Sequence, residues 1–484
     1  MSKKILFRWL AIVLSLGVLS AACGSDRDDA TTTTTTTTTT AAPVDDGADD
    51  DTSDDTTTTE PAPVDPCEAV ALEATEIGVT EDTIKVIVMA DVDNQLAPGL
   101  FQGSRDGVEA WERAINDAGG LACRDVEVEF HDSQLRGDRT VEGFLKACDS
   151  ALALVGTTVL FGLDTDDLTS CADQAGDPIG VPDIAYITTE VPHQCSTTSF
   201  HLSRPGAECP YEGGERGGSA NIGAVRWLRE QSGGDFNGLF LVPADLPSTI
   251  SSSIPLLTAM QDDGFVFDGV FGVAGQATQA ENGPYVQTMR DGGANFVYNG
   301  SNDQAMLKIR REAAVQGLDV DSVTWVCSLA CYTPSFIEEG GDAAEGVYVW
   351  SWFLPFEEAD TNEELAKFMD AIDNDFPPAW AAGAWGDGVL FEQAVNAIVD
   401  RDGPNGITRA ALLEELRSVT EFSVNGWWAP ADLTDTNTTS GCFVLLQVQD
   451  GAFARVEPAA RGEMNCDSTP VAVTVNPDTF TLDG

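Results

Sequence analysis

The sequence predicts an α/β fold that is divided into two lobes, each built on a parallel-type sheet. Three observations support this prediction. Residues 83–132 have the pattern of a strand, a helix and a second strand. Similar helix and strand patterns then alternate along the chain. The part with a globular composition spans roughly 400 residues, which is more than one hydrophobic core usually holds.

The segment 83–132 predicts a β-α-β unit. A short run of apolar, mostly β-branched residues around Val86 predicts a strand that is buried on both faces. Apolar residues then recur at helical spacing from Val108 to Ile115, and Gly119 ends the predicted helix. Alternation up to Phe130 predicts the second strand. The loop after the first strand is therefore expected at the carboxyl edge of a sheet, where open α/β sheets bind ligands.

The same patterns continue after this unit. The chain is expected to cross between the lobes near 203–206 and again at 348–352. The glycine-rich segment 213–219 is interpreted as a flexible connector, because it lacks the lysine and the spacing of a phosphate-binding loop. Further strands are expected at 152–155, 184–187, 239–242, 265–271, 296–298, 324–326 and 443–448, and helices at 141–150, 221–230, 284–291, 305–316, 388–399 and 409–419.

The predicted organisation has a leader, a tether, two discontinuous lobes and a tail. The predicted boundaries are a signal peptide at 1–22, a disordered tether at 23–77, a first lobe at 78–203 and 352–425, a second lobe at 204–351 and 426–460, and a polar tail at 461–484.

The N-terminus has the features of a secretory signal. Basic residues precede an apolar run at 10–19, and small residues lead to Cys23. This ending resembles a bacterial lipobox, although Ser20 stands where such motifs usually have leucine. The resemblance implies that Cys23 is acylated and holds the protein on the extracytoplasmic face of the cell membrane. The alternative is an ordinary signal peptide followed by an unmodified cysteine.

The amino-acid composition predicts a disordered segment and argues against one class of function. Residues 25–66 are rich in Thr, Asp, Ala and Pro, including an unbroken threonine run at 31–40, which predicts a disordered acidic tether. The chain carries 79 Asp+Glu against 25 Lys+Arg, for a net charge of -54. Such a charge argues against nucleic-acid binding, which needs basic patches. We interpret it as a solvated acidic surface rather than a cation-binding device.

The chain has eleven cysteines, so ten remain once Cys23 is set aside. An even number after a secretion signal predicts disulfides. An alternative is a zinc site that uses His193, Cys195, His201 and Cys209, although the spacings of structural zinc sites are absent. Neighbouring cysteines suggest the pairs Cys67 with Cys123, Cys148 with Cys171, Cys195 with Cys209, Cys327 with Cys331, and Cys442 with Cys466.

No catalytic motif is found. His131, His193 and His201 are scattered, and none belongs to a GxSxG or HExxH motif. Asp91 and Asn94 follow the first strand, where a nucleotide-binding fold would have a glycine-rich turn. The sequence therefore predicts no catalytic residue, no cofactor and no metal site, and an enzyme of an unrecognised type stays as the alternative.

Several motifs together resemble a known family. DGVEAWERAINDAGG, GVPDIAYITTE, NFVYNGSNDQAMLKIRREAAVQG and GDAAEGVYV follow one another as in type 1 periplasmic binding proteins of ABC importers, in the branched-chain amino acid (Leu/Ile/Val) binding group. The resemblance covers roughly residues 78–456. It implies two Rossmann-like lobes joined by a multi-strand hinge, with a small polar ligand such as an amino acid, amide or carboxylate held between them.

The resemblance also implies partners. They are a membrane permease of the ABC type and the membrane reached through the N-terminal lipid, and the protein is expected to be a monomer. Some relatives have a disulfide that corresponds to the Cys148 and Cys171 pair. A ligand-binding ectodomain of a sensory system, which would use the same fold with a separate receptor, is the alternative function.

Polar residues after the predicted strands are the candidate ligand contacts. In relatives, hydroxyls and amides in the loops at 157–164 and 188–189 hold the ligand carboxylate. Each candidate has an alternative interpretation as a turn or helix-cap residue. The candidates are Asp91, Asn94, Thr157, Asp164, Thr188 and Thr189 in the first lobe, and Asp245, Asn299, Ser301 and Ser328 in the second.

One departure from the family bears on the ligand. Amino-acid-binding relatives place an acid in the loop that here is 327–331, where it pairs with the ligand ammonium, and this loop has none. The loop after Val242 also lacks the aromatic residue of many relatives. Burying an ammonium without a counter-charge costs several kcal/mol. We therefore predict that a leucine-like ligand binds poorly unless Asp91 or Asp245 replaces the missing acid.

Overall fold

The computed structural model describes residues 67, 70–203, 206–211, 213–274 and 276–483. All of them belong to one compact unit, Pro63–Gly484. The predicted signal peptide, the predicted acylation site Cys23 and most of the predicted tether lie outside the described residues.

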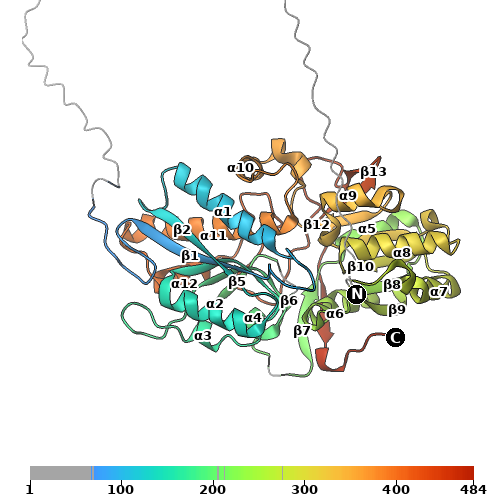
Figure 1. Cartoon of the computed structure of the whole chain (residues 1–484), viewed down its shortest axis with the longest axis horizontal. Helices are drawn as coiled ribbons and strands as arrows, with labels where there is room; N and C mark the ends of the chain where they lie inside the picture. The colour runs from blue at the N-terminus through green and yellow to red at the C-terminus, as the bar shows by residue number, and fades with distance from the viewer. Residues whose placement is uncertain (1–66, 68–69, 204–205, 212, 275, 484) are drawn as a thin grey trace, which may run out of the picture. The chain divides into compact units, whose positions relative to one another are not determined.

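The first lobe has a five-stranded, fully parallel sheet in the order β2-β1-β3-β4-β5. Helices α1 and α11 pack on one face and α2 on the other, so that α1 and α2 lie on opposite sides of the sheet in Figure 1. The elements are β1 Thr83–Ala90, α1 Gln102–Asp117, β2 Asp125–Asp132, α2 Gly137–Ser150, β3 Ala153–Val159, α3 Asp166–Thr169, β4 Asp183–Thr188, α4 Val191–Gln194, β5 Ser199–His201, α10 Glu363–Ala371, α11 Ala379–Asp402 and α12 Arg409–Leu416.

Strand β1 shows why the sequence folds this way. Val86 and Val88 join the hydrophobic core that includes residues of α1 and α11. Ile87 and Met89 join the separate core that contains Phe144 of α2. A strand with apolar residues on both faces has to be covered on both faces, as parallel sheets are. The continuous apolar run therefore indicated the strand and both of its coverings.

The second lobe has a seven-stranded sheet in the order β14-β13-β12-β11-β10-β8-β9. Strands β8 to β12 are parallel, and β13 and β14 join one edge in antiparallel fashion. Helices α5 and α6 share one core with the sheet, and α7 and α8 share the other. The elements are α5 Gly223–Ser232, β8 Asn237–Pro243, α6 Pro247–Asp262, β9 Val266–Val273, α7 Gly283–Gly292, β10 Phe296–Asn299, α8 Asp303–Val315, β11 Thr324–Cys327, α9 Pro334–Gly340, β12 Tyr348–Ser351, β13 Val444–Gln449 and β14 Ala452–Glu457.

The fold class predicted from the sequence is confirmed. The chain leaves the first sheet after β5, builds the second sheet through β12, returns to the first lobe with α10 to α12, and comes back with β13. The exact lobe boundaries stay a prediction. Two sheets that share a chain in this way can move relative to each other only by bending the segments that connect them.

A third, three-stranded antiparallel sheet corrects two expectations. It has the order β15-β7-β6, with β6 Gly206–Ala207, β7 Arg216–Ala220 and β15 Val471–Val475. The segment 213–219 was expected to be a flexible connector, yet most of it is β7. The segment 461–484 was expected to be a polar tail, yet it supplies β15. Each strand is stabilised by a partner distant in sequence, which the local composition does not indicate.

The C-terminal segment also packs onto the second lobe. Val473 and Val475 are buried in the core that contains α5 and α6. Further on, the Asp483 backbone N–H donates to Val270 O on the edge strand β9 at 2.9 Å, and its carboxylate accepts from Val270 N at 2.9 Å. The segment therefore connects the three-stranded sheet to the outer edge of the seven-stranded one.

Helix α11 returns to the first lobe and packs closely against α1. A Cβ atom at Gly107 of α1 would lie 2.2 Å from the Ala381 carbonyl oxygen, and one at Gly383 would lie 2.3 Å from the Tyr186 ring. Only glycine permits such contacts. The helix begins at Ala379, well before the predicted start at Gly388. The prediction missed the first turns because they are buried on nearly all sides and show no helical alternation of polar and apolar residues.

A carboxyl group is buried in this helix. Asp387 is fully inaccessible, and neither of its oxygens has a hydrogen-bond partner among the described residues. Burial, and secondly the charge of Asp183, raises the pKa of Asp387 well above its ordinary value. Asp183 itself accepts hydrogen bonds from His193 Nε2 and Ser199 Oγ, both at 2.7 Å. The first lobe therefore favours the protonated form of Asp387.

All five predicted disulfides are confirmed. Cys148–Cys171 links α2 to the loop after α3, and Cys195–Cys209 links the end of α4 to the segment after β6. Because Cys195 and Cys209 are bonded to each other, their thiolates are not available to the zinc site considered above. The full set is Cys67–Cys123, Cys148–Cys171, Cys195–Cys209, Cys327–Cys331 and Cys442–Cys466.

The buried carboxyl predicts a pH-dependent stability. In the unfolded chain Asp387 releases its proton at about pH 4, whereas the folded chain retains it to a higher pH. Stability from this group is therefore lost as pH rises from about 4 through the folded-state pKa. Asp387→Asn removes the titration, so its melting temperature should fall less over this range. Asp400→Asn, at an exposed position of the same helix, should keep the wild-type profile. An unchanged profile in Asp387→Asn would contradict the prediction.

The docking of β15 predicts a position-specific loss of stability. Val473→Asp places a charge in the core of the second lobe and should lower the free energy of unfolding by about 3 kcal/mol. Ala472→Asp, at the exposed neighbouring position on the same strand, should change it by less than about 0.5 kcal/mol. Urea denaturation of both variants checks this. Equal, small effects would mean that β15 does not pack as described.

Candidate functional site

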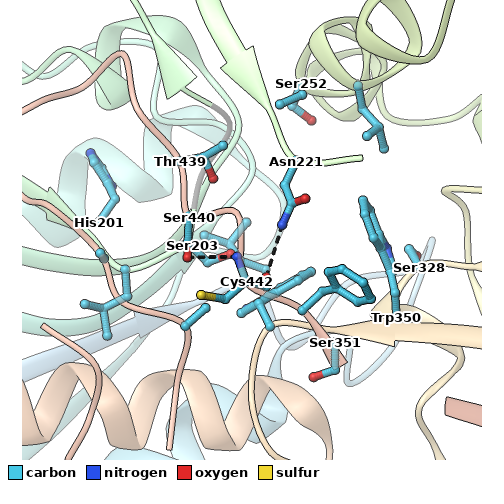
Figure 2. A pocket seen from close by; sticks show the side chains of 18 of the residues that line it. His201, Ser203, Asn221, Ser252, Ser328, Trp350, Ser351, Thr439, Ser440 and Cys442 are labelled. Atoms are coloured by element: carbon cyan, nitrogen blue, oxygen red, sulfur yellow. Dashed lines mark hydrogen bonds between the residues drawn. The ribbon is translucent and has the colours of Figure 1, made fainter. Parts of the chain in front are cut away.

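A cavity of about 470 Å³ lies where residues of the two lobes and of the connecting segments meet. The first lobe contributes the end of β4 and the start of α11, including Trp380. The second contributes one face of α6 and the carboxyl ends of β10, β11 and β12, including Tyr298, Ser328 and Trp350. The segments 429–432 and 438–443 complete the wall, and Figure 2 shows it from close by. Cavities of this size bind small organic molecules in other proteins.

Aromatic side chains form much of the wall. Tyr298 and Trp350 pack edge to face with their ring centroids 6.3 Å apart. Trp380 is held by an edge-to-face contact with Phe101 at 5.6 Å. Trp352 and Phe443 also line the cavity. Rigid aromatic walls of this kind supply contact area to a ligand at a low entropic cost.

Three of the predicted site residues line this cavity, namely Thr188, Thr189 and Ser328. Thr188 Oγ1 lies 3.2 Å from His201 Nδ1, and Thr189 Oγ1 donates to Leu160 O at 3.1 Å. The loop of the two threonines is supported by Gln194, whose Nε2 donates to both of their carbonyl oxygens.

Ser328 is positioned by the short disulfide loop. It precedes a single turn of 3₁₀ helix, Leu329–Cys331, and the Cys327–Cys331 bond closes this turn. Tyr332, which directly follows this turn, is buried. Its hydroxyl donates to Glu357 Oε2 at 2.5 Å and accepts from Phe356 N at 2.9 Å. The loop is thus fixed to the chain crossing that follows β12.

Asp91 lies outside the cavity lining and organises loops instead. Its carboxylate is fully buried and accepts from Ser133 Oγ at 2.7 Å, Leu135 N at 2.7 Å and Leu160 N at 2.9 Å. Burial raises the pKa of Asp91 even though these hydrogen bonds favour the charged form. The arrangement holds three loops together at the carboxyl edge of the first sheet.

Three more first-lobe candidates are absent from the cavity lining. Asn94 closes a turn by accepting from Ala97 N at 2.7 Å and donating to Ala97 O at 2.9 Å. Asp164 accepts from the backbone of Asp166 at 3.1 Å, at the start of α3. Thr157 is buried in β3. Their role in ligand binding stays a prediction.

The remaining second-lobe candidates lie beside the cavity or away from it. Asn299 is buried, donates to Asn302 O at 2.9 Å and accepts from the Ser301 backbone at 3.2 Å. It therefore shapes the turn that presents Gly300 to the cavity. Asp245 is exposed in the turn between β8 and α6.

The acid that reaches the cavity is Asp432. Neither Asp91 nor Asp245 is among the lining residues, so the geometry gives no support to the hypothesis that one of them replaces the missing acid. Among the described lining residues, Asp432 carries the carboxylate and His201 the imidazole. Asp432 Oδ1 accepts from Thr434 N and Oγ1 at 2.8 and 2.7 Å, which fixes the turn in which it lies.

Sequence reasoning missed the residues that come from a helix face and from the chain crossings. Thr249, Ser252, Ser253 and Leu256 lie on one face of α6 and line the cavity. Their spacing is helical and could have been noticed. Asn221, by contrast, reaches the cavity because β7 is a strand, and this depends on the distant β15.

Two further features are absent from the described part of the chain. Within it, no three His, Cys, Asp or Glu side chains are grouped as metal ligands would be. A search of the same residues finds no helix with the length and apolar character of a membrane span.

Comparisons with known proteins agree on one fold. The sequence model of the family described as periplasmic binding protein matches residues 83–452. No curated protein matches the chain significantly by sequence. Among solved structures, an ABC transporter substrate-binding protein of Aeropyrum pernix is 14% identical with a TM-score of 0.60, covering 77% of this chain and 94% of its own.

Two further structures have the same level of similarity. A leucine-binding protein of Thermotoga maritima is 14% identical with a TM-score of 0.56, covering 82% of this chain and 100% of its own. A fatty acid ABC transporter substrate-binding protein of Thermomonospora curvata is 14% identical with a TM-score of 0.60, covering 86% and 98%. At such identities the structures establish the fold. Because the family model spans most of the sequence, the chain belongs to the type 1 periplasmic binding protein family.

Proposed function

We propose that this protein is the extracytoplasmic solute-binding component of an ABC importer. In this proposal it captures a small organic molecule in the cavity and delivers it to a membrane permease. The observation that supports this most directly is that both lobes and the segments joining them line one cavity. Similar structures include ABC transporter substrate-binding proteins, which is consistent with the proposal.

The proposed mechanism is closure of the lobes around the ligand. The lobes meet at one rim, where Gln276 Nε2 donates to Leu96 O at 3.4 Å. Leu246 at the start of α6 packs there against the apolar cluster that contains Phe101 and Trp380. Such contacts are made when the lobes approach and are lost when they separate. Ligand contacts that bridge the lobes would therefore stabilise the closed state relative to the open one.

We propose binding without chemical conversion. The cavity lining holds no pair of carboxylates among the described residues. The Thr188 hydroxyl lies 3.2 Å from His201 Nδ1, and neither residue belongs to a GxSxG or HExxH motif. The ligand is expected to be returned unchanged.

We also propose that the protein is held on the membrane by a lipid on Cys23 and acts as a monomer. The signal-like N-terminus and the acidic, threonine-rich segment that follows support an anchor and a spacer. The spacer would allow the two lobes to reach a permease while the anchor keeps the protein near it.

Filling the cavity predicts a selective loss of binding. A ligand present at 100 times its Kd raises the free energy of unfolding by about 2.7 kcal/mol. The full chain is screened for a thermal shift against amino acids, amides, urea, carboxylates and short peptides. Ser252→Trp, on the lining face of α6, should abolish any shift, while Gln261→Trp, at an exposed position of the same helix, should retain it. A shift that survives Ser252→Trp would place the ligand elsewhere, and no shift across a broad panel would count against the function.

The proposed lipid on Cys23 can be tested by labelling. Labelled fatty acid fed to cells that produce the chain should appear on the intact protein. It should be absent from Cys23→Ser, and this variant should appear in the soluble fraction. Label that remains on Cys23→Ser would contradict the proposed anchor.

A further inference from the structure

Aromatic rings line the cavity from both lobes. Trp380 comes from the first lobe, at the start of α11, and Trp350 comes from the second lobe, near the carboxyl end of β12. Trp352 and Phe443 add two rings from the segments that connect the lobes. A ligand in the cavity is therefore bordered by aromatic side chains that belong to separate parts of the molecule.

The first lobe holds the Trp380 ring by two aromatic contacts. Its centroid lies 5.6 Å from that of Phe101 in an edge-to-face arrangement and 6.1 Å from that of Tyr186 in a tilted one. Phe101 and Tyr186 are buried, whereas Trp380 is only half-buried and lines the cavity. The ring is thus supported from inside the lobe, and part of its surface stays accessible to a ligand.

The second lobe supports Trp350 in a similar way. Trp350 packs edge to face against Tyr298 with centroids 6.3 Å apart, and Tyr298 stacks on the buried Phe240 at 4.9 Å. In Figure 2, Trp350 lies near Ser328, and His201 lies on the opposite side of the view. The three rings form a row that leads from the core of the sheet to the cavity. Because each ring packs against the next, the orientation of Trp350 is fixed before a ligand binds.

The rest of the wall and the size of the cavity suit a bulky apolar body. Ile187, Leu202 and Leu256 line the cavity together with the segment 429–431. The volume of about 470 Å³ is the space of roughly 15 water molecules. An apolar body of this size that enters the cavity removes its own surface and that of the wall from water, which favours binding.

Rings that are held in fixed orientations discriminate between an aromatic and a saturated body. Aromatic pairs in edge-to-face or offset-stacked geometry gain affinity beyond the area that they bury, because the positive edge of one ring meets the negative face of the other. A cyclohexyl group has no such charge distribution. Area alone favours cyclohexyl over phenyl, since cyclohexyl is the bulkier and more apolar group. A preference for phenyl therefore reports contacts with the rings of the wall.

We propose that the cavity selects a solute with an aromatic ring, and that Trp350 and Trp380 contact this ring from the two lobes. The inference rests on the proposed function and specifies the body of its ligand, while the head group is left open. It differs from the small polar ligand that the family resemblance implied. It also gives closure a physical basis, because a ring that contacts both tryptophans stabilises the closed arrangement of the lobes.

The test compares pairs of compounds that differ in one ring. Calorimetry on the full chain measures Kd for 3-phenylpropanoate, 3-phenylpropanamide, 3-phenylpropylamine and L-phenylalanine, and for the cyclohexyl counterpart of each. In any pair that binds, the phenyl compound should bind at least about threefold more tightly. Equal or tighter binding of the cyclohexyl compound, or no binding of any of these compounds at millimolar concentration, would overturn the proposal.

Three variants assign the preference to the wall. Trp350→Leu and Trp380→Leu keep an apolar side chain but remove the ring, so each should lower the phenyl-to-cyclohexyl affinity ratio at least about twofold. Trp227→Leu, at a tryptophan of α5 outside the lining, should keep the wild-type ratio. Circular dichroism checks that each variant is folded. A ratio unchanged in both lining variants would overturn the proposal, and the comparison on the wild-type chain stands by itself if a variant does not fold.

The outcomes also separate this inference from the proposed function. Tighter binding of a cyclohexyl compound that is abolished by Ser252→Trp would refute the aromatic ligand and leave solute binding in place. Failure of the whole broader panel to give a shift sensitive to Ser252→Trp is what would refute solute binding itself.

Discussion

The close contact between α1 and α11 is the constraint on which the arrangement of the lobes depends. The chain leaves the first lobe after β5 and rejoins it only with α10 to α12. Gly107 and Gly383 let the returning helix approach α1 and Tyr186 at distances that no larger residue allows. The start of α11 is thereby fixed beside β4, so that Trp380 and Thr188 line one cavity. A packing contact in the core of one lobe therefore places Trp380 in the wall of the cavity.

The polar character of the site depends on where hydroxyl hydrogens are directed. Serine and threonine in a helix readily donate to the carbonyl of the preceding turn, and α6 shows this at Ser252 and Ser253. Such bonds satisfy the protein internally and leave lone pairs towards the cavity. The Cys327–Cys331 loop holds Ser328 at the cavity wall. Composition alone would describe Ser252 and Ser253 as donors towards the cavity, whereas each donates to Thr249 O within the helix.

The sequence predicted the features that depend on local patterns. Apolar runs such as that around Val86 gave the central strands, neighbouring cysteines gave the five disulfides, and the order of motifs gave the family. Three of the predicted site residues line the cavity, because they lie at or directly after the ends of strands. The rest could not be found locally. The lining face of α6 and segment 429–443 depend on tertiary placement, and β7 is a strand only because β15 pairs with it. Asp91 follows a strand as a ligand contact would, but three internal donors occupy it.

The pairing of β7 with β15 has a consequence for the timing of folding. Translation proceeds from the N-terminus, so residues 216–220 are synthesised long before residues 471–475. Until the later segment emerges, β7 lacks its longer partner in the three-stranded sheet, and Asn221 at its end lacks a fixed position. A nascent chain whose residues 471–475 are still inside the ribosome therefore lacks the strand that fixes Asn221 in the cavity wall.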